Sequence, residues 1–308
     1  MPRPDDVLLP HGVARRVDVA AATSTSTVGR WLARGQLLVV APGVVALPDR
    51  AARWADRARA ATLYAGAPLS HLSALIAAGL ARPTAGPLHV TVGFERCLRD
   101  APDVRVHRSG RRLATIRCDG LDAVEPSRSL VDAWSWAWSP VRNVRAPAEQ
   151  PVVRQAVIEA VRTRMVRAPE VRRTSARFGR HAGRAELALL LELVERGCQS
   201  ELEVFGVQHV LPGPPALPAY VQQHRVVLPD GRAAELDAAW PEAQVAVELD
   251  GAAFHGSRAA RERDLRRDSA LAALGWVVLR FSYERLISDP DGCRREIEAV
   301  VRHRLADR

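Results

Sequence analysis

The chain has 308 residues, enough for two or three hydrophobic cores, and its 47% hydrophobic and 26% charged residues are typical of a folded globular protein. No run approaches the roughly 18 apolar residues of a membrane span, and the first residues lack the apolar core of a signal peptide. The four cysteines are scattered without a CxxC pair. Composition therefore argues against a membrane protein, a zinc finger and a disulfide framework, and the default expectation is the cytoplasm.

The charge is divided unevenly along the chain. The net charge is +9, and every basic residue is arginine. Residues 1–181 hold 28 arginines and 15 acids, whereas residues 182–308 hold 16 arginines and 20 acids. This division indicates that one part holds a polyanion such as nucleic acid while the other concentrates carboxylates. The alternative is an arginine-rich surface that is only solvated.

Residues 1–50 predict a winged-helix DNA-binding domain. A short helix over 17–22 is followed by a second helix to about Arg34, with hydroxyls near Ser24 as its cap. Gly35 suits the helix end, and the run LLVVAPGVVAL predicts a hairpin around residues 41–43. The second helix carries side chains that can bond phosphates and base edges in a major groove. These candidate DNA-binding residues are Ser26, Thr27, Arg30 and Arg34. A small structural module is the alternative.

Residues 51–181 predict a mixed α+β connecting domain. The alanine-rich stretch to residue 80 reads as helical, and alternating runs within 87–132 predict strands. A helix begins near Pro126, a proline-containing loop covers 139–151, and further helices follow to about Arg196. His71 lies among small and apolar residues, so we interpret it as a packed, hydrogen-bonded histidine with no chemistry.

Residues 182–308 predict a third domain with the element order αβββαβ. A helix begins at Ser200, three strands follow, and a helix and a last strand complete the order. The predicted strands cover 220–228, 233–240 and 244–249, and the later helix and strand cover 257–274 and 276–281. Pro229 to Arg232 is a strong turn signal between the first two strands. We take the strand over 276–281 to be continuously apolar.

Three acids stand out in this domain. Glu248 and Asp250 are two residues apart, so they share one face of a strand. Asp237 lies on the preceding antiparallel strand, beyond a tight turn that brings it opposite the far end of that strand. Crowded carboxylates repel one another, and a hard cation such as Mg²⁺ offsets the repulsion. Gly251 permits a sharp bend, and His255 is a candidate general acid or base.

Each candidate has a simpler alternative. The three acids could face solvent on amphipathic strands. Glu203 fits the S-x-x-E capping box as well as it fits the outer shell of a metal site. Arg263 and Arg267 lie on a helix of alternating charge, which is usually solvated but could also contact a phosphate.

Two sequence runs carry a resemblance to a known family. VELDGAAFHG and the later RDLRRDSALAALGWVVLRF resemble the endonuclease-like domain of unknown function that is related to the very-short-patch-repair endonucleases. These enzymes belong to the PD-(D/E)XK nuclease superfamily. The resemblance covers about residues 198–286 and implies a sheet flanked by helices and Mg²⁺-dependent phosphodiester hydrolysis.

The resemblance also assigns residues. Asp237 matches the first metal-binding aspartate, Glu248 the second acidic position, and Glu203 the acid of the first helix. Asp250 stands where the superfamily usually has lysine, and His255 matches the histidine after the glycine turn. Because the chain has no lysine, a second metal, His255 or an arginine must activate water or stabilise the transition state.

The N-terminal part resembles AbiEi-type antitoxins. The resemblance rests on the helix–helix–hairpin segment, on PLSHLSALIAAGL and on PSRSLVDA. It implies a winged helix that binds DNA, for example at an operator.

Together these features predict an endodeoxyribonuclease that uses Mg²⁺, with Mn²⁺ as a substitute. Asp237, Glu248 and the backbone carbonyl of Leu249 are expected to bind the ion. Asp250 and His255 are expected to position or deprotonate the attacking water. The partner is DNA, with no membrane. The alternatives are a non-catalytic DNA-binding regulator of the antitoxin kind and a protein-interaction module.

Overall fold

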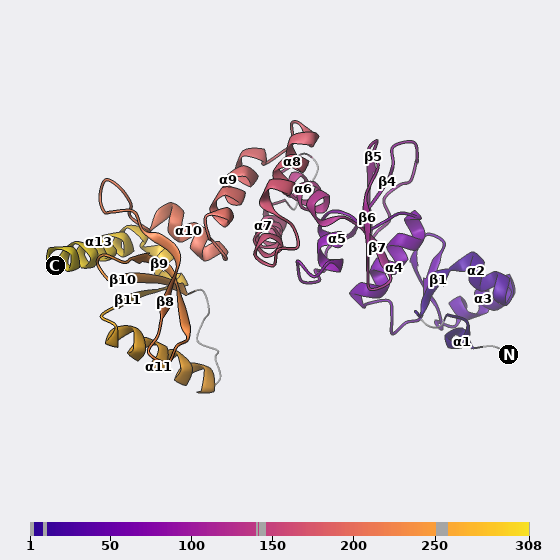
Figure 1. Ribbon diagram of the computed structural model, residues 1–308. Helices are drawn as coiled ribbons and strands as arrows, with labels where there is room; N and C mark the ends of the chain where they lie inside the picture. Colours follow the sequence, from indigo (N-terminus) through magenta and orange to yellow (C-terminus); the bar gives the residue numbers. More distant parts are fainter. Residues whose placement is uncertain (1–2, 9–10, 140, 142–145, 251–257, 308) are drawn as a thin grey trace. The chain divides into compact units, whose positions relative to one another are not determined.

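The structure is a computed structural model that describes residues 3–8, 11–139, 141, 146–250 and 258–307. The chain forms two compact units, Met1–Ala188 and Leu189–Arg308. The fold is mixed α/β, as predicted, with several small sheets (Figure 1). The domain limits predicted at residues 50 and 181 remain predictions. None of the described helices has the length and apolar character needed to cross a membrane.

The first unit begins with a small helical module and its sheet. Its elements are α1 (Pro4–Leu8), β1 (Val13–Arg15), α2 (Arg16–Ala22), α3 (Thr25–Ala33), β2 (Leu38–Ala41) and β3 (Val44–Ala46). The Ser24 hydroxyl accepts the Thr27 amide at 3.1 Å, and Gly35 has a φ of +66°, so the predicted cap and helix end are confirmed. β1 was not predicted, because three residues are too few to show alternation. It pairs antiparallel with β3 in the sheet order β1-β3-β2.

The remainder of the first unit surrounds two small two-stranded sheets. Its elements are α4 (Trp54–Ala65), α5 (His71–Ala77), β4 (Leu88–Gly93), β5 (Val104–Ser109), β6 (Thr115–Cys118), β7 (Leu121–Val124), α6 (Pro126–Ala137), α7 (Ala146–Arg162), α8 (Ala168–Phe178) and α9 (Arg184–Glu195), the last of which crosses into the second unit. β4 and β5 are parallel, whereas β6 and β7 are antiparallel. The loop predicted to Pro151 is wrong in part, because α7 begins at Ala146 with Pro151 inside it.

The second unit confirms the predicted αβββαβ order. Its elements are α10 (Glu201–His209), β8 (Val221–Val227), β9 (Ala233–Trp240), β10 (Val245–Asp250), α11 (Arg258–Ala273), β11 (Val277–Ser282), α12 (Tyr283–Ser288) and α13 (Pro290–Ala306). The four strands form one sheet in the order β11-β10-β9-β8. β10 and β11 are parallel, and the other pairs are antiparallel.

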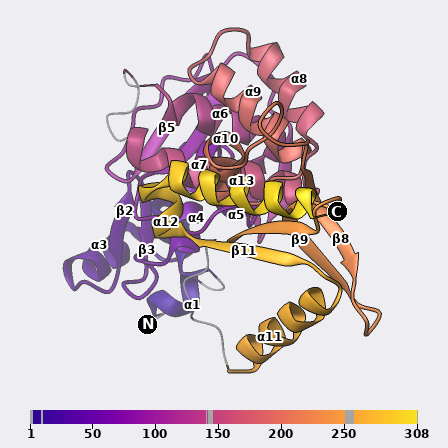
Figure 2. The same cartoon turned by 90° about the vertical axis from the view of Figure 1, so that its left-hand side faces the viewer.

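Helices cover both faces of this sheet. Figures 1 and 2 show α13 on one side and α11 on the other. Val245, Val247 and Leu249 pack in the core cluster that includes residues of α10 and α13, whereas Ala246 packs in the cluster that includes Leu271 of α11. Alternation along β10 therefore places Glu248 on the α11 face.

A glycine lets α10 lie close to β10. A Cβ at Gly206 would lie 2.3 Å from Cδ1 of Leu249, so the side chain of Leu249 occupies the space that any larger residue needs. We expect Gly206→Ala to lower the free energy of unfolding by about 1–2 kcal/mol, because overpacking outweighs the gain in helix propensity. Urea unfolding measures the change.

Gly29→Ala is the matched control for this substitution. Gly29 lies in α3, and a Cβ there would meet no heavy atom within 4 Å. We expect the control to raise stability by up to about 1 kcal/mol. Equal effects of the two substitutions would contradict the proposed packing of α10 on β10.

Candidate active site

Asp237 lies where β9 and β10 stop pairing. The register between the strands runs from Val245–Trp240 to Val247–Ala238, so Asp237 follows directly after the last pair. Its Oδ2 accepts the backbone amide of Leu249 at 2.8 Å. The Asp237 carboxylate thus accepts an amide of β10 that would otherwise bond to a backbone carbonyl of β9. It lies beside the end of β10, as the length of the turn between the two strands predicted.

Glu248 is held by two arginines. It lies opposite Arg280 in the parallel register of β10 and β11, and Nε of Arg280 donates to its Oε2 at 2.8 Å. Arg267 of α11 makes an ion pair with Oε1. The Glu248 side chain is only 12% exposed, so these contacts balance a charge that burial would otherwise penalise.

Arg280 also connects Glu248 to a second acid. Its guanidinium makes two contacts with the carboxylate of Asp268 on α11. The hydrogen bond from Arg280 lowers the pKa of Asp268, and the reciprocal contact raises the pKa of the arginine. Sequence reasoning missed Arg280, because we took its strand to be continuously apolar. A lone charge in that run was the available signal.

Glu203 caps its own helix and also faces β8. Ser200 accepts the Glu203 amide at 3.1 Å and donates to its Oε1 at 2.8 Å, while the amide of Gln199 donates to Oε2 at 2.9 Å. The Ser200 cap is therefore present, but Glu203 accepts the amide of Gln199 and not that of Ser200, so the capping box is not formed as predicted. Nε2 of Gln223 also donates to Oε2 at 2.8 Å, and burial raises the pKa of Glu203.

Gln223 marks an irregular point in the sheet beside Asp237. Its φ is +50°, although it is not glycine, and the flanking pairs place it opposite Asp237 in the β8–β9 register. Such backbone strain is found at sites where the surrounding contacts determine a particular side-chain direction. Here the side chain is directed to Glu203. Nothing in the sequence indicated this distortion.

The pKa of Asp237 depends on the charges of both Glu203 and Glu248, so the three acids influence one another. The pKa of Asp237 is raised to about 6, mainly by burial and also by the charges of Glu203 and Glu248. The amide of Leu249 and the charge of Arg267 oppose this rise. The negative charge of Asp237 is therefore not balanced by the positive charges around it. A bound cation would supply that balance.

The oxygens of these acids suit a hard divalent cation. Oε1 of Glu248 is buried and forms an ion pair with Arg267. The geometry of this contact is not that of a hydrogen bond. Glu203, Asp237 and Glu248, whose side chains the structure describes, do not each place an oxygen within 4.8 Å of the other two. The donor set fits Mg²⁺, although the carboxylates of Glu203, Asp237 and Glu248 are not gathered around one point.

The other predicted residues of this domain have different outcomes. Asp250 ends β10, but its side chain lies outside the described residues, as does all of His255. Arg263 is exposed on α11. Arg267 points into the site, and it also donates to the carbonyl of Glu235 at 2.7 Å. The prediction of a phosphate contact stays open for both arginines.

The predicted DNA-binding residues lie on α3. Ser26, Arg30 and Arg34 are exposed, whereas Thr27 is half-buried. The Thr27 hydroxyl accepts from Arg30 at 3.2 Å and from Ser24 at 2.9 Å. Three of the four side chains are therefore accessible, and Thr27 has a structural role in the cap.

Comparison with known families addresses the second unit. Residues 231–301 match the family model REase_MTES_1575, a restriction-endonuclease-like family. The match supports a restriction-endonuclease-like domain in the C-terminal part of the chain, which suggests a nuclease that acts on nucleic acid. The match includes Asp237, Glu248, Arg267 and Arg280, and it begins after Glu203. Restriction-endonuclease-like folds usually use a divalent metal. No curated protein matches the chain.

Proposed function

We propose that the restriction-endonuclease-like domain is a metal-dependent endodeoxyribonuclease and that the N-terminal module brings it to DNA. The observation that carries the proposal is the position of Asp237 at the end of the β9–β10 pairing, with a pKa raised to about 6 beside two further acids. This carboxylate lies within the family match.

The residues that would hold the cation are Asp237, Glu248 and the carbonyl of Leu249, with Glu203 outside them. Once bound, Mg²⁺ or Mn²⁺ supplies an acidified water and neutralises charge that develops on the phosphate. Asp250 and His255 position or deprotonate the attacking water.

The arginines around Glu248 replace the missing lysine. A cation held by Glu248 would take the place of its arginine partners, which would leave Arg267 free of this carboxylate while Arg280 keeps Asp268. A guanidinium presents several donors in one plane, which suits two oxygens of a phosphate. We propose that Arg267, from the α11 face, then binds the scissile phosphate.

A plasmid assay tests the nuclease proposal. Supercoiled DNA is incubated with the full chain in Mg²⁺, Mn²⁺ or EDTA, beside a Glu248→Gln variant purified in the same way. The expected result is nicking in either metal, none in EDTA, and a loss of at least about two orders of magnitude in the variant. Equal nicking by both proteins would identify a contaminant and contradict the proposal.

One observation favours a second candidate, a non-catalytic DNA-binding regulator. Glu248 already has two arginine partners, so its own charge is balanced without a metal. In this alternative the same plasmid assay shows no nicking in either metal, while the chain still binds a specific DNA sequence.

The N-terminal module makes its own prediction. Arg30→Ala is expected to weaken DNA binding and to reduce the slope of log Kd against log salt by about one, because one phosphate contact is lost. Fluorescence anisotropy at several salt concentrations measures the slope. Arg82→Ala, an exposed arginine outside α3, is the control. An unchanged slope for Arg30→Ala would remove this helix from the DNA interface.

A further inference from the structure

Three histidines meet in the first unit, which contains none of the carboxylates of the candidate active site. His71 begins α5, His89 lies on β4 and His107 lies on β5. One ring nitrogen of each lies within 4.8 Å of the other two. The packing and hydrogen bonding predicted for His71 are confirmed, but its neighbours are two more imidazoles, which the sequence did not indicate.

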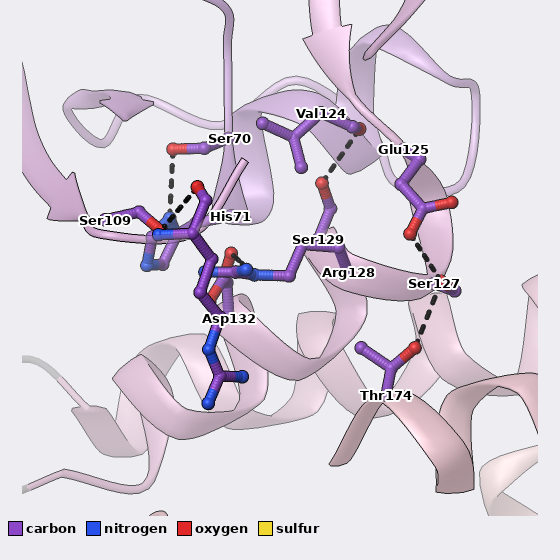
Figure 3. Close-up of polar contacts among 11 residues, drawn as sticks. Ser70, His71, Ser109, Val124, Glu125, Ser127, Arg128, Ser129, Asp132 and Thr174 are labelled. Carbon is purple, nitrogen blue, oxygen red and sulfur yellow. Dashed lines mark hydrogen bonds and ion pairs between the residues drawn. The ribbon is translucent and has the colours of Figure 1, made fainter. Parts of the chain in front are cut away.

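The fold holds these rings in place. His89 and Thr91 share a face of β4, and Thr91 lies opposite His107 in the parallel register. The amide of Ser70 donates to the carbonyl of His89 at 2.9 Å, which ties the start of α5 to β4. The Ser70 hydroxyl lies 3.0 Å from Nδ1 of His71 (Figure 3). A partner of this kind sets the orientation of a histidine that binds a metal through its other nitrogen.

His71 adopts a strained backbone conformation. Its φ is +51°, in the left-handed region that a residue with a Cβ rarely adopts. A single residue there costs about 1 kcal/mol or more, and such residues persist where the surroundings require a particular side-chain position. At His71 the result is a ring stacked on His107, with centroids 3.6 Å apart.

The cluster is buried and covered by an aromatic ring. His89 is 2% exposed and His71 7%. The indole of Trp136 meets all three imidazoles edge-on, at centroid distances of 4.9–6.4 Å. His71 and His89 are therefore largely shielded from water.

A cavity of about 440 Å³ opens beside the histidines, and Thr91 faces it without a partner. The cavity is lined by His71 and His107 together with Thr91 and several charged residues. Thr91 is 3% exposed, and in the described part of the chain its hydroxyl oxygen makes no hydrogen bond. A buried hydroxyl without a partner is costly, so it indicates a polar occupant at this point.

We propose that His71, His89 and His107 form a binding site for a transition-metal ion of the zinc class. Three imidazoles with an open fourth position are a common ligand set for Zn²⁺ outside purely structural sites. Nδ1 of His89 and Nε2 of His107 are 2.8 Å apart and share a proton in the metal-free state. Ligands of a tetrahedral Zn²⁺ lie about 3.3 Å apart, so binding would require these two nitrogens to separate by about 0.5 Å and the shared proton to move to the other nitrogen of its own imidazole.

The chemistry of the site distinguishes it from the carboxylate site. Imidazole nitrogens select Zn²⁺, Cu²⁺ or Co²⁺, whereas Mg²⁺ prefers oxygen. The open position faces the cavity, where Arg108, Arg128 and Arg180 outnumber Asp132. Asp132 pairs with Arg128 at 2.7 Å along α6 (Figure 3). The excess positive charge favours an anion, such as phosphate, at the open position.

Cobalt spectroscopy on the full chain tests the proposal. One equivalent of Co²⁺ added to the chelator-treated protein is expected to give the visible bands of a four-coordinate ion, and one equivalent of Zn²⁺ should abolish them. Inorganic phosphate is expected to shift the bands, because it exchanges at the open position. Absence of the bands in the wild type would overturn the metal site, and bands unaffected by phosphate would overturn the open position.

Variants assign the ligands and separate the two sites. His107→Ala is expected to weaken Zn²⁺ binding by at least about 100-fold, with circular dichroism as the check on folding. His303→Ala, an exposed histidine of α13, is the matched control and should bind like the wild type. Asp237→Asn should also keep the full cobalt spectrum, so failure of the nuclease proposal leaves this one standing. Loss of the bands in Asp237→Asn but not in His107→Ala would overturn the assignment.

Discussion

Asp237→Asn is expected to slow metal-dependent DNA cleavage by about three orders of magnitude or more, yet to raise the unfolding temperature of the metal-free protein at pH 8. Asparagine can still accept the amide of Leu249, so the end of the β9–β10 pairing keeps its hydrogen bond. What the variant loses is a charge that burial and two neighbouring acids disfavour. The same charge is what would bind the cation.

The pH dependence of stability follows from the direction of this shift. The pKa of Asp237 is about 6 in the folded state and 3.8 ordinarily, so the folded protein holds the proton more tightly. Metal-free wild-type protein therefore loses stability as the pH rises from about 4 through 6, by about 3 kcal/mol at most, and solvent screening reduces this figure. The uncharged asparagine avoids this loss.

Thermal unfolding in chelator at pH 4 and pH 8 measures the effect. The variant should exceed the wild type at pH 8 and lose that advantage at pH 4, where Asp237 is protonated. Asp230→Asn, in an exposed turn of the same domain, is the matched control and should change neither value. An Asp237→Asn protein that is no more stable at pH 8 would show that the folded state does not disfavour the charged form of Asp237.

Arg267→Gln is expected to lower the rate of DNA cleavage by about 10²–10³-fold, because one preorganised donor to the transition state is lost. The same change should leave Mn²⁺ binding unchanged or several-fold tighter, since it removes a positive charge that competes for Glu248. A residue that only supported the fold would weaken metal binding and catalysis together.

Single-turnover cleavage and Mn²⁺ titration, measured on the same preparations, separate these effects. Arg266→Gln is the matched control, because Arg266 lies on the same helix and pairs only with the exposed Glu262 among the contacts described. Arg267→Lys should recover part of the rate, since it restores the charge without the planar donors. Weaker Mn²⁺ binding by Arg267→Gln, or normal cleavage, would remove Arg267 from the proposed mechanism.

Local sequence patterns determined most of the second unit. Alternation and turn residues predicted β9 at its observed bounds, and the length of the turn after it brought Asp237 beside the end of β10. The caps at Ser24 and Ser200 were predictable because an N-cap bond joins residues only three apart. In each case the deciding signal is local: the residues and length of one turn, or a bond between residues three apart.

Only the tertiary structure decided which side chains surround Glu248 and which surround His71. Arg280 reaches Glu248 from 32 residues away, because β11 lies beside β10 in parallel register. His89 and His107 are 18 residues apart, and they meet at His71 because β4 and β5 pair in parallel beside the start of α5. Strand order and register between distant segments follow from the packing of the whole core. They cannot be predicted from the alternation of residues within one segment.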